Sequence, residues 1–360
     1  MRVLTVVGNR PQFVKAAAVS RPLRERHEEL LVHTGQHYDA DMSQVFFDEL
    51  PVPEPDFHLG VGSGPAAVQT GRMLEALEPV LRETAPGLVL VYGDTNSTLA
   101  GALAAAQAHV PVGHVEAGMR SFDRSMPEEL NRVLTDHASD LLLCSTSTAV
   151  KNLAREGIER GVHLVGDAMA DVALATAQVA RERRDVLDGF GVEPAGYLLV
   201  TAHRAGNVDS PERLAALVEL LLALPRPVVF PVHPRTRARL EAAGLADRLA
   251  DAEGFHASAP VGYLELLALA IHARAVITDS GGLQKEAYLV EVPCVTLRDR
   301  TEWVETVESG WNTLVDLDPE AALAALDRPR PPEHPDLYGA GQAGERIRDA
   351  VDDFARLQGA

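Results

Sequence analysis

Short apolar runs that alternate with helical segments are the feature that most constrains the fold of this chain. Runs such as VLTVVG, LVLVYGD and DLLLCST are each followed by a turn and then by an amphipathic or alanine-rich segment. A second series begins near residue 196 with YLLVTAH, PVVFPVH and AVITDSGG. Strands that are apolar on both faces and alternate with helices are typical of a parallel sheet covered by helices. The sequence therefore predicts an α/β fold with two Rossmann-like, doubly wound parallel-sheet domains.

The overall charge and the cysteines restrict the class of protein. A formal net charge of -19 argues against a surface that binds nucleic acid or an anionic membrane. The two cysteines, Cys144 and Cys294, lie in apolar runs without zinc-binding spacing, which predicts buried thiols in a reducing compartment. The apolar run at the N-terminus is too short for a signal peptide or a membrane span. We therefore expect a cytoplasmic protein.

Polar side chains gather where the predicted strands end. Ligands of open parallel sheets bind beyond the carboxyl ends of the strands. Two such edges that face each other would form one interdomain cleft. The residues at these edges include Asn9, Arg10, Lys15, Asp94, Glu116, His203, Arg204, His233 and residues 279–282.

The stretch VITDSGGLQKEA, residues 276–287, predicts a strand that leads through Ser280, Gly281 and Gly282 into a helix. Glycines let backbone N–H groups approach a ligand, a helix N-terminus attracts anions, and the serine adds a donor. This pattern indicates a metal-free phosphate site of the diphosphate-sugar kind. Glu286, about one turn further on, suits hydrogen bonds to ribose hydroxyls. The structural alternative is a tight turn in which Ser280 caps the helix.

Three acids at or near strand ends are candidates for catalysis: Asp94 in YGDTNST, Glu116 in VPVGHVEAG and Glu128 in MPEELNR. Gathering carboxylates is costly unless they work as acid, base or charge stabiliser. Each also has a structural alternative. Asp94 can cap a helix, Glu116 can pair with Arg120, and Glu128 can interact with a helix dipole.

Cations and histidines supply the opposite charge. Arg10 and Lys15 lie about one helical turn apart, so both cations can reach into the predicted cleft. The alternative is that both are solvated surface charges. His203 and Arg204 in TAHRAGN and His233 in PVHP end successive strands. Histidine titrates near neutrality and can hydrogen-bond a leaving phosphate. The sequence lacks both the dinucleotide-binding glycine pattern and the P-loop, which disfavours hydride transfer and ATP hydrolysis.

The motifs in combination resemble the non-hydrolysing UDP-N-acetylglucosamine 2-epimerase family. They occur in the family's order along almost the whole chain: GNRPQFVK, VYGDTNST, GHVEAGMRS, MPEELNR, TAHRAGN, PVHP and DSGGLQKEA with RDRTEW. The resemblance implies the glycosyltransferase-B fold, with an interdomain active site and a C-terminal helix that returns to the first domain. On this basis we expect an N-terminal domain of residues 1–167 plus 342–360 and a C-terminal, UDP-binding domain of residues 168–341.

The resemblance also implies an activity, namely the interconversion of UDP-GlcNAc and UDP-ManNAc by a homodimer without metal or other cofactor. UDP leaves in an anti elimination that removes the C2 proton and gives 2-acetamidoglucal, and it then adds back with protonation on the other face of C2. By position, the implied catalytic residues are Asp94, Glu116, Glu128 and His203, with Lys15 near the sugar. The implied UDP-sugar contacts are Arg10, Arg204, His233, Ser280, Gly281, Gly282 and Glu286.

The chain departs from the family pattern at a few positions. Gln12 and Gly206 stand where acids are usual, and we expect Gln12 to alter a contact to Arg10 and Gly206 to remove a charge beside His203. Gln36 and His37 in TGQH resemble part of an allosteric UDP-GlcNAc site, whereas the following GVGSGPAAVQ replaces a charged segment.

Three other functions stay open at this point. They are a hydrolysing 2-epimerase that releases ManNAc and UDP, a glycosyltransferase of the same fold, and a catalytically silent sugar-nucleotide sensor. The sequence is equally compatible with sugar supply for a cell-surface polysaccharide and for a secondary metabolite.

Overall fold

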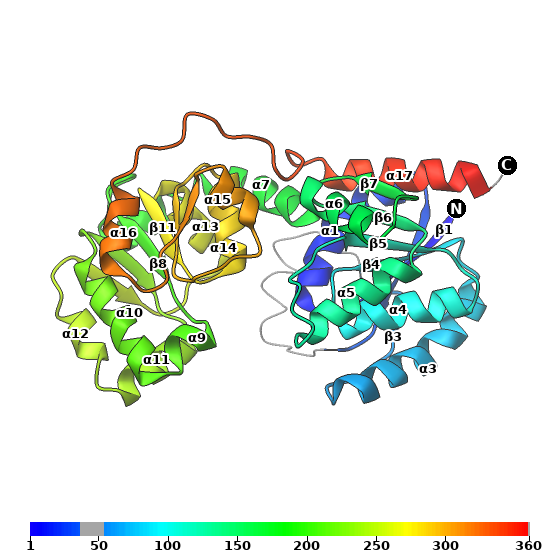
Figure 1. Cartoon of the computed structure of the whole chain (residues 1–360), viewed down its shortest axis with the longest axis horizontal. Coiled ribbons are helices and arrows are strands. Elements are labelled where there is room, and N and C mark those ends of the chain that lie inside the picture. The colour runs from blue at the N-terminus through cyan, green and yellow to red at the C-terminus, as the bar shows by residue number, and fades with distance from the viewer. Residues whose placement is uncertain (37–53, 359–360) are drawn as a thin grey trace. The chain divides into compact units, whose positions relative to one another are not determined.

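The computed structural model describes residues 1–36 and 54–358, and the chain divides into two compact units. Unit 1 comprises Met1–Val172 and Asp336–Ala360, and unit 2 comprises Ala173–Pro335. Each unit is built on one parallel sheet with helices packed against it (Figure 1). The predicted fold class, two parallel-sheet α/β domains, is confirmed.

The described residues of unit 1 form a seven-stranded parallel sheet in the order β3-β2-β1-β4-β5-β6-β7. Its strands are β1 (Arg2–Val7), β2 (Glu28–His33), β3 (Phe57–His58), β4 (Leu88–Tyr92), β5 (Val112–Ala117), β6 (Leu141–Cys144) and β7 (Val162–Leu164). Its helices are α1 (Arg10–Arg24), α3 (Ala66–Thr84), α4 (Asn96–Gln107), α5 (Pro127–Ala138), α6 (Ser147–Arg155), α7 (Ala168–Ala180), which continues into unit 2, and α17 (Ala343–Gln358).

Strand β1 shows why continuous apolar runs predicted this sheet. Val3 and Val7 pack into one core with α1 and α17, whereas Leu4 and Val6 pack into a second core with α3 and α4. Successive side chains of a strand point to opposite faces, so both sets must be apolar when both faces are covered.

The described residues of unit 2 form a six-stranded parallel sheet in the order β10-β9-β8-β11-β12-β13. Its strands are β8 (Leu198–Thr201), β9 (Val228–Pro231), β10 (Phe255–Ser258), β11 (Ala275–Thr278), β12 (Cys294–Thr296) and β13 (Asn312–Leu314). Its helices are α8 (Asp185–Phe190), α9 (Ala205–Val208), α10 (Pro211–Ala223), α11 (Pro234–Ala242), α12 (Ala246–Ala250), α13 (Tyr263–His272), α14 (Gly281–Leu289), α15 (Val304–Glu308) and α16 (Pro319–Leu326).

The last helix, α17, belongs to unit 1, although all of unit 2 precedes it in the sequence (Figure 1). Its Ile347 and Val351 are fully buried in the core that β1 and α1 also line. The Asp171 carboxylate accepts hydrogen bonds from the first two backbone N–H groups of α17, at 3.0 and 2.8 Å. A Cβ on Gly344 would lie 2.3 Å from the Ala18 carbonyl oxygen, so α1 and α17 pack too closely there for a larger residue.

Both cysteines are buried, as predicted, and both are free thiols. Burial raises the pKa of Cys144 and of Cys294 to about 12. Within residues 1–36 and 54–358, no helix combines the length and apolar character needed to cross a membrane.

Candidate functional site

The order of strands reverses at one point in each sheet, between β1 and β4 in unit 1 and between β8 and β11 in unit 2. In open parallel sheets, ligands bind beyond the carboxyl ends of the strands at such a point. Lys15 and Asp94 lie beyond β1 and β4, and His203 and Ser280 lie beyond β8 and β11. These four residues therefore lie at the two reversal points, whereas Glu116 lies on β5, Glu128 on α5 and His233 just after β9. Arg10 is the first residue of α1.

Lys15 and Glu116 form an ion pair at the edge of the unit 1 sheet. Their side chains are only 13% and 9% exposed. Burial alone would lower the pKa of Lys15, but the Glu116 carboxylate holds it above its usual value. Glu116 thus pairs with Lys15 and not with Arg120, the partner considered from the sequence. The pair supplies a nearly buried carboxylate together with a neutralising ammonium group.

The backbone of Glu116 is irregular. Strand β5 pairs with β6 through Val115 and Ala117 opposite consecutive residues of β6, so Glu116 is the extra residue of a β-bulge. Its φ is +71°, in the left-handed region that non-glycine residues rarely adopt. Bulges beside active sites redirect a side chain, and such backbone strain persists only where surrounding contacts hold it.

Gly93 brings the end of β4 against this ion pair. Its φ is +66°, and a Cβ there would lie 3.3 Å from Oε2 of Glu116 and 3.4 Å from Nζ of Lys15. The Gly93 N–H donates to the Val115 carbonyl oxygen at 3.0 Å. The turn that presents Asp94 is therefore in contact with the residues that present Glu116.

Asp94 forms an ion pair with Arg132 of α5. The Arg132 guanidinium also contacts Glu129 at 3.2 Å. Asn131 donates to the Asp94 carbonyl oxygen at 3.0 Å. Thr95, and not Asp94, caps α4 through its side chain. Arg132 is a candidate functional residue that the sequence did not single out, and its place four residues after Glu128 on a helix was the available signal.

The two neighbouring acids at the start of α5 differ in their surroundings. Glu129 is buried and accepts hydrogen bonds from the Ser121 N–H at 2.9 Å and the Phe122 N–H at 3.0 Å. Glu128 is exposed in the first turn of the helix. Glu129 therefore holds the loop before α5 in place. Glu128 makes no such contact to this loop, and its exposed carboxylate suits a residue that contacts substrate.

Gln12 connects the ends of β1 and β4. Its Oε1 accepts from the Gly8 N–H at 2.7 Å, and its Nε2 donates to the Tyr92 carbonyl oxygen at 2.6 Å. The same amide contacts the hydroxyls of Thr95 and Thr98 at 3.0 and 2.9 Å. The residue that replaces the usual acid thus orders the reversal point of unit 1.

In unit 2, Asp279 organises the loop that carries His203 and Arg204. This fully buried carboxylate accepts from both backbone N–H groups, at 3.0 and 2.9 Å, and from the Asn207 amide at 3.1 Å. Nδ1 of His203 lies 3.5 Å from the same carboxylate. The end of β11 therefore fixes the loop that follows β8.

The rings of His203 and His233 are stacked, with centroids 5.1 Å apart. Nδ1 of His233 accepts a hydrogen bond from the Arg235 N–H at 3.2 Å and so caps α11. Burial and the neighbouring His203 lower the pKa of His233. A neutral His233 accepting at Nδ1 carries its proton on Nε2, which leaves that N–H to donate to a ligand.

Ser280 caps α14, because its Oγ accepts from the Leu283 N–H at 3.4 Å. The structural alternative for Ser280 is thus present, and so are the donors of a phosphate site. A Cβ on Gly281 would lie 3.5 Å from Nε1 of Trp303 and 3.6 Å from a terminal nitrogen of Arg204. The exposed Gly282 follows. An anion at this helix start would meet backbone, indole and guanidinium donors, and also the Glu302 carboxylate, whose Oε2 lies 3.7 Å from the same Cβ position and which pairs with Arg298.

Glu286 lies further along α14 and accepts a hydrogen bond from the Tyr263 hydroxyl at 3.0 Å. Burial raises the pKa of Glu286, and the Tyr263 hydrogen bond only partly opposes this effect. The contact of Glu286 with ribose hydroxyls stays a prediction.

The residues considered for an allosteric site are only partly described. Gln36 is buried, and its Oε1 accepts from the Ser97 N–H at 3.0 Å and the Ser97 hydroxyl at 2.6 Å. His37 lies outside the described residues. Among the residues that are described, none form a cluster of three or more His, Cys, Asp or Glu side chains that would hold a metal ion.

Two parallel-sheet units, with acid–cation pairs near one reversal point and a glycine-rich helix start at the other, define a two-domain α/β protein of the glycosyltransferase-B class. The sequence model of the UDP-N-acetylglucosamine 2-epimerase family matches residues 21–352. The chain therefore belongs to this family, and the predicted family membership is confirmed.

Relatives and a solved structure give the same result. The chain is 47% identical over 361 residues to the UDP-2,3-diacetamido-2,3-dideoxy-D-glucuronate 2-epimerase of Pseudomonas aeruginosa, which covers 97% of this chain and 99% of that protein. It is 43% identical over 359 residues to the UDP-N-acetylglucosamine 2-epimerase of Methanocaldococcus jannaschii, with 96% and 98% covered. A crystal structure of the M. jannaschii UDP-GlcNAc 2-epimerase in complex with UDP-GlcNAc and UDP matches with a TM-score of 0.82 at 42% identity, covering 98% and 100% of the two chains.

Proposed function

We propose that this protein is a non-hydrolysing UDP-N-acetylglucosamine 2-epimerase that interconverts UDP-GlcNAc and UDP-ManNAc. The observation that carries the proposal is the pairing of two carboxylates with two cations at one sheet edge. Glu116 pairs with Lys15, and Asp94 pairs with Arg132. Family membership supplies the substrate class, and these pairs supply groups suited to its chemistry.

The reaction needs a base and a leaving-group site. A carboxylate removes the C2 proton, the C1–O bond breaks, and UDP leaves with the electron pair to give 2-acetamidoglucal. UDP then adds back to C1, while an acid delivers a proton to the opposite face of C2. Asp94, Glu116 and Glu128 are the candidate acids and bases, and Lys15 and Arg132 set their charge.

Unit 2 would bind the nucleotide. The diphosphate meets the α14 N-terminus at Ser280, Gly281 and Gly282, with Arg204 beside it, and Glu286 accepts from the ribose. His203 is held by Asp279 and stacked on His233, so it is positioned to hydrogen-bond the leaving phosphate. Arg10 is assigned to the substrate by its position in the family pattern.

Deuterium exchange tests the proposal directly. In D2O, UDP-GlcNAc should gain deuterium at C2 and UDP-ManNAc should form in the absence of any acceptor, both followed by NMR. No deuterium at C2 and no UDP-ManNAc would refute it. Free ManNAc released in step with UDP would identify a hydrolysing enzyme. A requirement for an acceptor would identify a glycosyltransferase, and thermal stabilisation by UDP-GlcNAc without turnover would identify a sensor.

A second substrate has a specific observation in its favour. The P. aeruginosa relative, at 47% identity, is named for a UDP-2,3-diacetamido-2,3-dideoxy-D-glucuronate, whereas the M. jannaschii relative, at 43%, is named for UDP-GlcNAc. Both names describe epimerisation at C2, so the same acids serve either substrate. Comparing kcat/KM for the two nucleotide sugars decides between them.

We also propose that the enzyme is a homodimer. Exposed Met126, Leu130 and Leu134 recur every fourth residue around α5 and so share one face of the helix. Sedimentation of the wild-type protein and of Leu130→Glu tests this proposal, and a monomeric wild type would refute it.

A further inference from the structure

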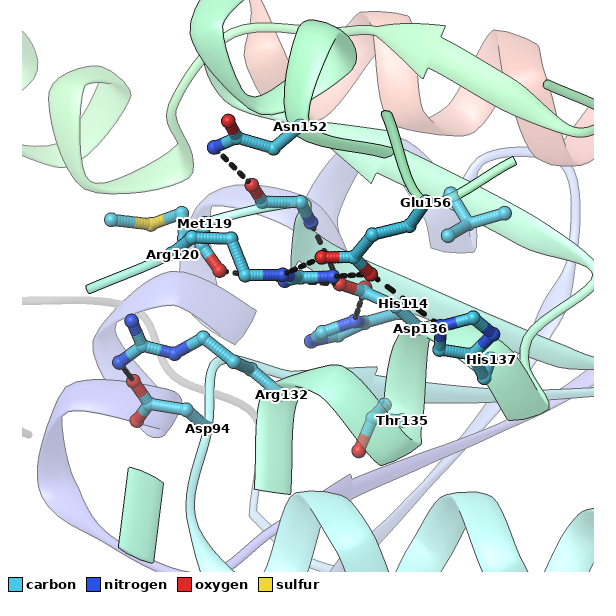
Figure 2. Close-up of polar contacts among 12 residues, drawn as sticks. Asp94, His114, Met119, Arg120, Arg132, Thr135, Asp136, His137, Asn152 and Glu156 are labelled. Carbon is cyan, nitrogen blue, oxygen red and sulfur yellow. Dashed lines mark hydrogen bonds and ion pairs between the residues drawn. The ribbon is translucent and has the colours of Figure 1, made fainter. Parts of the chain in front are cut away.

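A largely buried group of charged side chains in unit 1 contacts the turns that present Asp94 and Glu116. We name this group the His114 cluster. It consists of His114, Arg120, Asp136 and Glu156, and Figure 2 shows their side chains converging between β5, α5 and α6.

The ring of His114 is completely buried and contacts an oxygen atom at each nitrogen. Nδ1 lies 2.7 Å from Oδ1 of Asp136, and Nε2 lies 2.7 Å from the Gly93 carbonyl oxygen. A carbonyl oxygen only accepts hydrogen bonds, so Nε2 carries a proton. Whether Nδ1 carries one as well depends on the charge of Asp136.

Asp136 is placed as a carboxylate. Its Oδ2 lies 2.7 Å from the Arg120 guanidinium and accepts from the Gly118 N–H at 3.1 Å. An ionised Asp136 only accepts, so both nitrogens of His114 donate and the ring is an imidazolium.

The contact between His114 and Asp136 itself calls for a proton between them. A neutral ring with its proton on Nε2 would turn the lone pair of Nδ1 toward the Asp136 carboxylate at 2.7 Å. Arg120 completes the cluster and binds Glu156 through two hydrogen bonds, at 2.7 and 2.8 Å. Glu156 is 28% exposed and also lies 3.4 Å from Nε2 of His137.

The cluster holds the backbone on both sides of the bulged Glu116. The Gly93 N–H donates to the Val115 carbonyl oxygen at 3.0 Å, and the Gly93 carbonyl oxygen accepts from His114. Strand β5 therefore contacts both polar backbone groups of Gly93. Gly118 donates to Asp136 and accepts from the Asn152 amide at 3.0 Å. The strained residue between these points is therefore clamped by the cluster.

We propose that His114 is a positioning residue, an imidazolium that joins Gly93 to Asp136 and thereby holds Asp94 and Glu116 in reacting geometry. The inference rests on the proposed function, because it assigns the two acids to the reaction. It adds a group that touches neither substrate nor reacting atoms. Misplacing a reacting group by about 1 Å costs about 10²-fold in rate.

Imidazole NMR of the wild-type protein tests the protonation state without relying on activity. In 15N-labelled protein at neutral pH, both His114 nitrogens should resonate as protonated nitrogens, with His114→Gln identifying the signal. One protonated and one unprotonated nitrogen would overturn the proposal. This measurement uses the intact chain and remains valid if the variants fold poorly.

Two amide variants separate the two contacts of the ring. His114→Gln places its amide nitrogen near the position of Nε2 and keeps a donor for Gly93, whereas His114→Asn keeps one for Asp136. We expect kcat for C2 exchange to fall about 10²-fold in His114→Asn and less in His114→Gln. Affinity for UDP should change by no more than about two-fold in either variant, since UDP is assigned to unit 2. His163→Gln, a half-buried histidine on β7, is the matched control.

The outcomes keep the two proposals apart. Folded variants that retain the wild-type kcat would overturn the positioning role while the proposed function stands. Equal loss of kcat and of UDP affinity would also overturn it, because that result describes general unfolding. A wild-type enzyme without C2 exchange would refute the proposed function, and the ring protonation would then be judged by NMR alone.

Discussion

Lys15 on α1 and Glu116 on β5 are separated by 101 residues in sequence and meet as an ion pair beside the point where the unit 1 sheet reverses its strand order. A lone buried carboxylate would tend to take up a proton and lose its value as a base. Lys15 supplies the opposite charge to the Glu116 carboxylate at contact distance.

Removing the charge of Lys15 is therefore expected to damage both folding and activity. Lys15→Met leaves Glu116 buried without a partner, which should lower the free energy of unfolding by about 3 kcal/mol and kcat by at least about 10²-fold. Urea unfolding and C2 exchange measure the two effects. Lys151→Met, at an exposed position on α6, is the control and should change neither. Full activity in Lys15→Met would contradict the assignment.

Arg132 should prove as important as the acids it contacts. Arg132→Met removes the partner of Asp94 and a partner of Glu129, and we expect kcat to fall about 10²-fold. Arg132→Lys keeps the charge but cannot reach both carboxylates with a planar fork, so it should be intermediate. Steady-state kinetics with UDP-GlcNAc measures this, and Arg155→Met, exposed on α6, provides the comparison. Arg132→Lys with wild-type kcat would show that bridging both acids is unnecessary.

Gly206 allows a test of whether the departure from the family pattern changes the reaction. A Cβ at Gly206 would have no heavy atom within 4 Å, so a larger side chain fits without displacement. Gly206→Glu should fold normally and gain up to about 1 kcal/mol of stability, since glycine weakens a helix. The yield of free ManNAc per UDP-ManNAc, followed by NMR, should be the same as in the wild type. A marked drop in free ManNAc would show that Gly206 admits water.

The stability of unit 1 should fall as the pH drops below about 6.5. Burial and the nearby His58 lower the pKa of His33, and burial also lowers the pKa of His27. Between each lowered value and the unfolded value of about 6.5, the unfolded chain binds a proton that the folded chain excludes, so stability is lost as pH falls. His33→Phe, which retains packing against Phe13, should lose less stability on acidification in urea titrations. An identical pH dependence in wild type and His33→Phe would contradict this assignment.

The strand ends were predictable because two patterns coincide there. An apolar run ends where helices no longer cover the sheet, so the polar residues that follow it lie at the carboxyl-end edge of the sheet. Asp94 after β4, His203 after β8 and Ser280 after β11 all follow from this rule. The family motifs then assigned candidate roles to these residues.

The pairings at the edge were not predictable from the same rule. Arg132 pairs with Asp94 from helix α5, which lies more than 30 residues further along the chain. The bulge at Glu116 depends on how β5 pairs with β6. The sequence places His114 beside Glu116 at the end of a predicted strand, but it gives no indication of what the ring contacts. Its two hydrogen bonds depend on Gly93 and Asp136, which no local spacing relates to it. Local patterns locate groups, but contacts between distant segments decide their charge state.

Helix α17 also sets an order for assembly on the ribosome. The core of unit 1 includes Ile347 and Val351, which are synthesised after every residue of unit 2. Unit 2 can therefore complete its interior while the chain is still growing, whereas the first sheet made must wait for the final helix. The paired acids of the N-terminal half would then gain their full rigidity only after α17 has been synthesised.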